Sequence, residues 1–246
     1  MTTLKTPEEI KVMLEGGKIS TMALRGVLSA IKPGVTLLAL DTIAHDILVQ
    51  NNAKPSFTTV DDYKFTTCIN VNDGIVHGLP NGYKIKSGDL VSIDLGALYK
   101  GFHTDLSYTV EVNSSKEQKF LNTGRLALDL AIAQAKVGNH MGDISSAIQK
   151  KVENAGYTVS RDLVGHGVGR ELHEDPYVPG YGSSGKGVLL KEGMVLAIEV
   201  LYEKGDPEIV VDFDGWTIRT ADGSLSALFE ASVAITKDGP LVLTEF

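Results

Sequence analysis

The apolar residues near the start of the chain recur at intervals of three and four, which predicts a long amphipathic helix. Thr6-Pro7-Glu8-Glu9 is typical of a helix start, because Thr6 can cap the first turn, Pro7 suits that turn, and Glu9 can reach back to the cap amide. The helical spacing continues to Ile31 and ends at Lys32-Pro33-Gly34. We expect a second helix over residues 38–49.

From residue 67 onward the pattern changes to short β-rich runs separated by turn residues. Strands are expected over Thr67–Val71, Leu90–Tyr99 and His103–Val112. Helical spacing returns at about residues 117–135 and 144–155, before a second strand-rich stretch from Met194 to Thr236. Such blocks favour an α+β fold, with helices packed on an antiparallel sheet, over a regular βαβ alternation. No linker or repeat interrupts the sequence, so a single domain over residues 1–246 is expected.

Composition narrows the classes of function. The chain has 246 residues, 43% of them apolar, and a formal net charge of −8, which argues against a surface built for nucleic acid or anionic membrane. The one cysteine, Cys68, cannot form an internal disulfide, and the first residues do not resemble a signal peptide. No apolar run approaches the roughly 20 residues that a membrane helix needs. We therefore expect a cytoplasmic protein with no specific nucleic-acid partner and no membrane partner.

Four acidic residues stand inside apolar strand patterns, where a carboxylate is costly to bury unless something neutralises it. They are Asp94, Asp105, Glu199 and Glu230. For any one of them, an outward-facing strand position is favoured by about two to one. Four together weaken that interpretation, because buried charges usually pair with cations or coordinate metal. The set predicts a cluster of divalent cations.

The geometry of the first acidic pair depends on the turn between two strands. Asp94 and Asp105 lie in consecutive strands, and a two-residue loop at Tyr99-Lys100 or Lys100-Gly101 would put both carboxylates on one face. A three-residue loop would place them on opposite faces, since a one-residue slip turns every side chain over. The sequence leaves both arrangements open.

Three histidines add further ligand chemistry. His77, His166 and His173 are all expected in glycine-bordered loops, where a lone histidine is usually a hydrogen-bonding residue. Their occurrence together with the four acidic residues favours a metal-binding role. Imidazole with carboxylates suits Mn, Fe, Co or Zn more than Ca or Mg. Motifs of serine hydrolases, zincins and P-loop proteins are missing, and Cys68 lacks an activating partner, so we expect it as a buried apolar residue or pocket wall.

Several motifs together resemble type I methionine aminopeptidase, a member of the M24 metallopeptidase family. They are Cys68–Gly78, Ser92–Leu95, Gly101–Asp105 and Gly165–Gly169, followed by His173–Pro176, Gly193–Glu199, Gly215–Thr217 and Ser224–Glu230. Their order and spacing match over nearly the whole chain. The resemblance implies the pita-bread fold, in which two pseudo-symmetric halves surround a central curved antiparallel sheet covered by helices. It also implies two divalent metal ions, Co, Mn, Fe or Zn, held by that sheet.

The resemblance assigns the metal ligands. Asp105 and Glu230 resemble the bridging carboxylates, Asp94 resembles a ligand of one metal, and His166 with Glu199 resemble ligands of the other. A pair of cations about 3.5–4 Å apart can share a hydroxide, lower its pKa and polarise the scissile carbonyl. Glu199 could also carry the proton in this scheme.

The resemblance assigns substrate contacts as well. His77 and His173 match outer histidines that contact substrate and stabilise the tetrahedral intermediate, so we expect neither as a primary metal ligand. Tyr63, Cys68 and Trp216 match walls of the methionine pocket, where a thioether packs well against aromatic rings.

The sequence departs from the family pattern at four positions. Leu172 and Val60 replace residues that are commonly aromatic, whereas Val200 and Ala231 occupy positions usually held by proline and histidine. The five ligand positions are unchanged. We therefore expect altered pocket shape and tuning of the surroundings, with the chemistry retained.

The implied function is metal-dependent removal of the initiator methionine from nascent polypeptides with a small second residue, through a metal-bridging hydroxide. A monomer with a transient ribosome contact is expected. One alternative is an Xaa-Pro aminopeptidase or a creatinase-like hydrolase of the same fold. Those enzymes usually carry an extra N-terminal domain, for which a first helix at residue 7 leaves no room. A second alternative is a non-catalytic pita-bread binding protein. Retention of all five metal ligands argues against it, because such proteins typically lose them.

Overall fold

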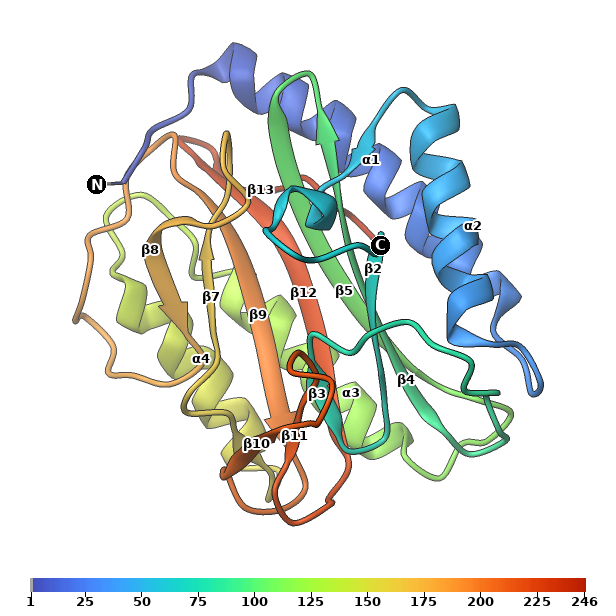
Figure 1. Ribbon diagram of the computed structural model, residues 1–246. Helices are drawn as coiled ribbons and strands as arrows, with labels where there is room; N and C mark the ends of the chain where they lie inside the picture. Colours follow the sequence, from blue (N-terminus) through green and yellow to red (C-terminus); the bar gives the residue numbers. More distant parts are fainter. Residues whose placement is uncertain (1) are drawn as a thin grey trace.

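The computed structural model describes residues 2–246, and its first two helices lie side by side (Figure 1). Helix α1 (Pro7–Ala30) begins with the predicted capping box: Thr6 Oγ1 accepts from Glu9 N at 3.2 Å, and Glu9 Oε2 accepts from Thr6 N at 3.0 Å. Helix α2 (Leu37–Gln50) is capped by Thr36. Both helices are therefore confirmed within a few residues of their expected ends.

A ten-stranded sheet forms the centre of the fold. Its four long strands are antiparallel neighbours: β4 (Leu90–Tyr99), β5 (Phe102–Glu111), β12 (Ser226–Thr236) and β9 (Val195–Glu203). The shorter strands are β1 (Lys54–Pro55), β2 (Thr67–Val71), β6 (Thr158–Val159), β7 (Val164–Gly167), β8 (Glu174–Pro179) and β13 (Gly239–Val242). The predicted block of antiparallel strands is confirmed.

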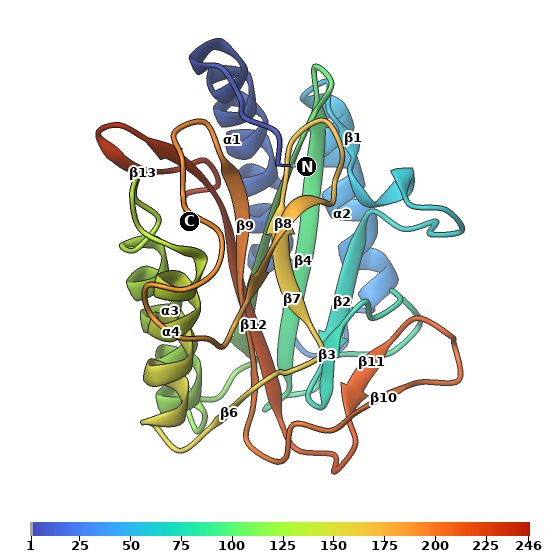
Figure 2. The ribbon, with the colours of Figure 1, turned by 90° about the vertical axis from the view of Figure 1, so that its left-hand side faces the viewer.

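The sheet has two halves, each backed by a pair of helices. Helices α1 and α2 cover the half with β4 and β5, whereas α3 (Gln118–Ile132) and α4 (Met141–Glu153) cover the half with β9 and β12. Figure 2 shows α3 and α4 on one side of the large sheet. On the other side lies a small sheet of β3 (Gly74–Val76), β10 (Ile209–Val211) and β11 (Ile218–Thr220), and a short 3-10 turn covers Phe57–Thr59.

Strand alternation separates the core from the opposite face of the sheet. Along β4, Val91, Ile93 and Leu95 point into the core under α1 and α2. Along β9, Leu196 and Ile198 point into the core under α3 and α4. Each fully buried aliphatic side chain contributes about 1.5–3 kcal/mol. The intervening residues therefore face away from the helices, and that is the face on which the acidic residues lie.

Candidate metal centre

The β4–β5 turn decides how the first two acids meet. Lys100 and Gly101 form a two-residue loop with positive φ angles of 49° and 83°, the combination that a tight type I′ hairpin requires. In this register Asp105 stands opposite Gly96, and so diagonal to Asp94 on the same face. The structure therefore has the first of the two arrangements that the sequence left open.

Two neighbouring rows of residues across the sheet carry all five predicted ligands. One row runs through Asp94, Ser107, Glu230 and Glu199, each paired with the next across adjacent strands. The other row, two residues along each strand, runs through Gly96, Asp105, Ser232, Ala197 and His166. The other residues of the two rows are all small, which leaves space above the sheet between the carboxylates. They are Gly96, Ser107, Ala197 and Ser232.

Hydroxyl groups join the two halves of the sheet at this point. The Ser232 hydroxyl accepts from the N–H of Asp105 and donates to its C=O, each at 2.8 Å. In the same way, the Thr109 hydroxyl donates to the C=O of Leu228 at 2.7 Å and accepts from its N–H at 2.9 Å. Between these two bridges, β5 and β12 pair directly only at Ser107–Glu230 and Leu106–Ala231. The hydroxyl bridges thus fix Asp105 and Glu230 across the junction of the halves.

The ligand atoms lie close together and away from solvent. Ligand atoms of Asp105, His166 and Glu230 are all within 4.8 Å of one another. His166 Nε2 lies 3.8 Å from Asp105 Oδ2 and 3.6 Å from Glu199 Oε1. Asp94 is also buried and interacts with Asp105. The five predicted ligands therefore form one cluster.

Burial shifts the protonation of these groups. It raises the pKa of Asp94, Asp105, Glu199 and Glu230 above the usual range, and repulsion among the carboxylates adds to the effect for all but Asp94. Burial also lowers the pKa of His166 to about 4. Its Nδ1 lies 2.9 Å from the Gly167 carbonyl, which can only accept, so Nδ1 carries the proton and Nε2 presents a lone pair to the acids.

Several carboxylate oxygens of the cluster are buried without a hydrogen-bond partner among the described residues, as expected at a binding site for a divalent cation. In the described part of the chain, Asp94 Oδ1, Asp105 Oδ1 and Glu230 Oε1 are buried and have no hydrogen-bond partner. Such oxygens are costly to bury unless a cation or donor satisfies them. Converging carboxylates with a neutral imidazole are a donor set that divalent transition metals accept. The residues present therefore fit a metal.

A cavity of about 130 Å³ opens onto this cluster, and all ten predicted site residues line it. They are Tyr63, Cys68, His77, Asp94, Asp105, His166, His173, Glu199, Trp216 and Glu230. Val60 and Leu172, the two altered wall positions, line it too. Phe57 and Val76 also contribute walls that sequence reasoning missed, since neither position carries a signal beyond its apolar character. The cavity thus joins a polar floor to an apolar wall.

The apolar wall is held by its own contacts. The Tyr63 ring packs edge-on against Trp216, with centroids 5.0 Å apart, and its hydroxyl donates to the Thr67 carbonyl at 2.8 Å. Cys68 Sγ donates to the Tyr63 hydroxyl at 3.2 Å. Burial raises the pKa of the Cys68 thiol, so this cysteine is a neutral wall residue.

The outer histidines approach the cavity from two sides. His77 follows β3 with a φ of +58°, and Gly78 N donates to Asn70 Oδ1 at 2.9 Å just beyond it. Burial lowers the pKa of His77, so its imidazole is neutral near pH 7. The His173 ring lies edge-on to the His166 ring, with centroids 4.4 Å apart. Neither histidine belongs to the group of Asp105, His166 and Glu230, whose ligand atoms lie within 4.8 Å of one another.

The expected loop position of His166 is wrong, because this histidine lies within strand β7. Its glycine neighbours reflect close packing of strands. A Cβ on Gly165 would lie 2.4 Å from the Ala197 carbonyl oxygen, and a Cβ on Gly167 would lie 2.4 Å from that of Asp175. The glycines thus allow β7 to lie between β8 and β9 and to bring His166 onto the ligand face.

The expected influence of Val200 and Ala231 on the pocket also needs correction. Both residues point into the core beneath α3 and α4, on the face of the sheet opposite the ligands. Each neighbours a ligand in sequence, but strand alternation turns it away from the cavity. These two substitutions change packing behind the site and leave the pocket wall alone.

Comparisons with known proteins give a consistent picture. The sequence matches metallopeptidase family M24 over residues 11–237. It is 42% identical to a methionine aminopeptidase of Clostridium perfringens, over 99% of both chains, and 40% identical to methionine aminopeptidase 1 of Bacillus subtilis, also over 99% of both.

Solved structures agree with the sequence matches. A methionine aminopeptidase from Thermotoga maritima superposes with a TM-score of 0.97 at 44% identity and covers 100% of both chains. A prolidase from Pyrococcus furiosus gives 0.80 at 28% identity, and the match covers 99% of this chain but 65% of that one. The predicted pita-bread fold is confirmed by this likeness.

Proposed function

This chain belongs to metallopeptidase family M24, and we propose that it hydrolytically removes the N-terminal methionine from polypeptides. The observation that carries the proposal is the single cavity in which a buried acidic cluster meets an apolar wall. The cluster suits metal-dependent hydrolysis, and the wall suits a methionine side chain. The names and full-length similarity of the relatives support the same activity.

We propose that two divalent ions, Mn, Fe, Co or Zn, belong to this site. Asp105 and Glu230 would bridge them, Asp94 would bind one, and His166 with Glu199 would bind the other. The buried carboxylate oxygens without partners support this assignment. When bound, such a pair polarises the scissile carbonyl and makes a water molecule nucleophilic near neutral pH.

We propose roles for the remaining residues, which their placement supports. The thioether of methionine packs against Tyr63 and Trp216, a favourable contact of sulfur with aromatic rings. Glu199, close to His166 Nε2, takes the proton from the attacking water and delivers it to the departing amine. His77 and His173 donate hydrogen bonds to the peptide and to the oxygen that gains negative charge.

We also propose a substrate range and a cellular setting for this activity. The small cavity favours polypeptides with a small second residue, because the wall and the metal cluster confine the scissile bond. We propose that residues 1–246 act as one catalytic domain, as a monomer, on nascent chains in the cytoplasm during a transient ribosome contact. Among the described residues, α-helices that could cross a membrane are missing.

Peptide hydrolysis tests the proposal. The protein is stripped with a chelator, resupplied separately with Mn, Fe, Co or Zn, and assayed on Met-Ala-Ser and Ala-Pro-Ala for release of the first residue. We expect metal-dependent release of methionine alone. Release of alanine ahead of proline would instead indicate an Xaa-Pro aminopeptidase. No release with any metal would favour a non-catalytic binding protein.

A further inference from the structure

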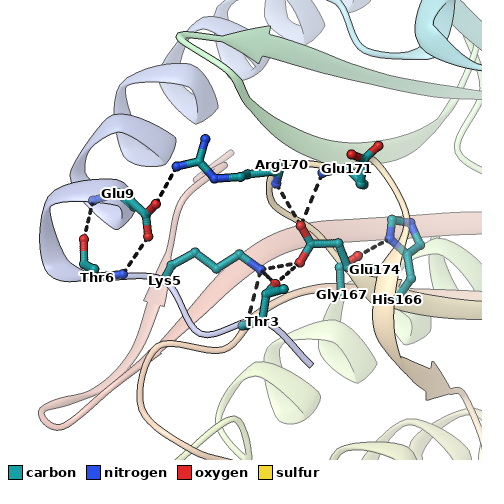
Figure 3. Close-up of polar contacts among 9 residues, drawn as sticks. All are labelled: Thr3, Lys5, Thr6, Glu9, His166, Gly167, Arg170, Glu171 and Glu174. Atoms are coloured by element: carbon teal, nitrogen blue, oxygen red, sulfur yellow. Dashed lines mark hydrogen bonds and ion pairs between the residues drawn. The ribbon is translucent and has the colours of Figure 1, made fainter. Parts of the chain in front are cut away.

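A buried ion pair ties the N-terminal segment to the turn that carries His173 (Figure 3). Lys5 Nζ lies 2.5 Å from Glu174 Oε2, and the two side chains are only 4% and 8% exposed. Lys5 also donates to Thr3 Oγ1 at 2.7 Å, and the Thr3 hydroxyl donates to Glu174. The Lys5 backbone is fixed separately, because its N–H donates to the Gly193 carbonyl at 2.7 Å.

The other Glu174 oxygen holds the turn itself. Glu174 Oε1 accepts from Arg170 N at 2.8 Å and from Glu171 N at 3.3 Å, so one carboxylate closes the turn over residues 169–174 (Figure 3). Lys5 packs against the start of this turn so closely that a Cβ on Gly169 would lie 2.3 Å from Lys5 Cε. The turn carries two cavity residues, Leu172 and His173.

Accepting the proposed function as a premise, we propose that Lys5 and Glu174 are positioning residues, which hold the turn so that His173 meets the substrate. The ion pair touches neither the cavity nor the metal-binding atoms. Its effect on the reaction therefore passes through the backbone of residues 170–174. A buried carboxylate that loses its cation is left without compensation, so removal of Lys5 should release Glu174 and with it the turn.

The Lys5→Met variant tests this inference by kinetics. Because a misplacement of about 1 Å can cost roughly 100-fold in rate, we expect kcat on Met-Ala-Ser to fall about 10- to 100-fold. We expect KM to change less, because Leu172 is the one residue of the apolar wall in the turn, whereas Tyr63, Cys68 and Trp216 lie outside it. Bound metal should be unchanged, since the turn carries none of the five proposed ligands. Lys11→Met, the same change on the exposed surface of α1, is the matched control and should behave as the unaltered protein.

A double variant separates positioning from general damage. Lys5→Met/Glu174→Gln removes both charges, yet the amide oxygen introduced in place of the carboxylate can still accept from Arg170 N and Glu171 N. We expect it to recover at least about tenfold in kcat over Lys5→Met. Failure of the second change to recover activity would overturn the inference, as would a loss of metal in proportion to the loss of kcat.

Hydrogen exchange gives a readout that needs no activity. In metal-free protein, the amides of residues 170–174 should exchange faster in Lys5→Met than in the unaltered chain, with α3 and α4 unchanged. If Lys5→Met does not fold, Glu174→Gln replaces it. In that variant the buried Lys5 ammonium keeps its charge without an anion, unlike in the double variant, so we expect the same faster exchange with a lower kcat. Unchanged exchange and kcat would overturn the inference. Absence of methionine release by the unaltered chain would defeat only the proposed function.

Discussion

His77 and His173 face one cavity, but the chain holds them by different means. His77 adopts a left-handed backbone conformation, which costs a non-glycine residue about 1–3 kcal/mol. The Asn70–Gly78 hydrogen bond and the Ile69–Gly78 backbone bond compensate for that strain. His173 instead lies next to Glu174, whose carboxylate closes the turn. Burial lowers the pKa of both imidazoles, and a neutral imidazole has one N–H with which to donate, as the proposed role of both histidines requires.

Substitution of His173 tests its role as a donor to the substrate. In His173→Ala we expect bound metal to stay at the unaltered level and kcat to fall about 100- to 1,000-fold, the range for loss of one oxyanion donor. Metal content by elemental analysis and kinetics on Met-Ala-Ser give the two quantities. Loss of a metal ion in this variant would make His173 a ligand and contradict the assignment. Tyr177→Ala, an exposed change in β8, is a control for the neighbourhood.

Strand register explains which parts of the site the sequence could predict. The bounds of β4 were predicted to the residue and the start of α1 was confirmed, because both depend on local patterns. The clustering of Asp94 with Asp105 needed only the length of one turn. The hydroxyl bridge from Ser232 to Asp105 could not be predicted, because it joins residues 127 positions apart. Its register depends on how two halves of the chain meet.

The positions that the sequence interpretation missed have different causes. Glycines around His166 resemble a loop in sequence, yet they permit close strand packing in β7. The orientation of Val200 could have been found, because alternation from Glu199 turns it to the opposite face. Phe57 was missed because a three-residue 3-10 turn has no periodicity to detect. The functional assignments themselves rested on the family resemblance, and the residue roles stay predictions.

Strand β9 carries a second buried acid, Glu203, which the proposed mechanism does not use. Both of its carboxylate oxygens are buried without a hydrogen-bond partner in the described residues. Burial, with a contribution from the Asp222 charge, raises the pKa of Glu203 to about 8. In the unfolded chain a glutamate titrates at about 4.3. The folded state therefore favours protonated Glu203, and its contribution to stability is full below the unfolded pKa and is lost as the pH rises through about 8.

Glu203→Gln should flatten this pH dependence, because the amide stays neutral. We expect its Tm to match that of the unaltered protein near pH 4 and to exceed it by several degrees above pH 8. Calorimetry of both proteins in metal-free buffer from pH 4 to pH 9 measures the difference. Glu208→Gln, at an exposed position, should show none. A variant that is less stable than the unaltered protein at high pH would show that Glu203 is charged and paired in solution.

At the scale of the whole molecule, the proposed metal centre spans the junction between the halves. Asp94 and Asp105 come from the half backed by α1 and α2, whereas His166, Glu199 and Glu230 come from the half backed by α3 and α4. Direct pairing of β5 with β12 is limited to two residue pairs. Metal binding would therefore connect the halves where the backbone ladder between them is short, and it would also relieve repulsion among buried carboxylates.

Metal binding should accordingly stabilise the entire fold. A ligand at 100 times its Kd adds about 2.7 kcal/mol to the free energy of unfolding, which corresponds to roughly 5–10 °C in Tm for a chain of this size. We expect that gain for Mn or Co added to metal-free protein. Asp105→Asn and Glu230→Gln each remove one proposed bridging carboxylate, one from each half. We expect both variants to fold. Because each binds metal more weakly, we expect each to lose most of the gain in Tm and to lose activity by several orders of magnitude. Glu203→Gln, outside the cluster, should keep the gain. If Asp105→Asn lost it but Glu230→Gln did not, the ions would bind to one half alone, and the junction would owe its stability to the Ser232 and Thr109 bridges.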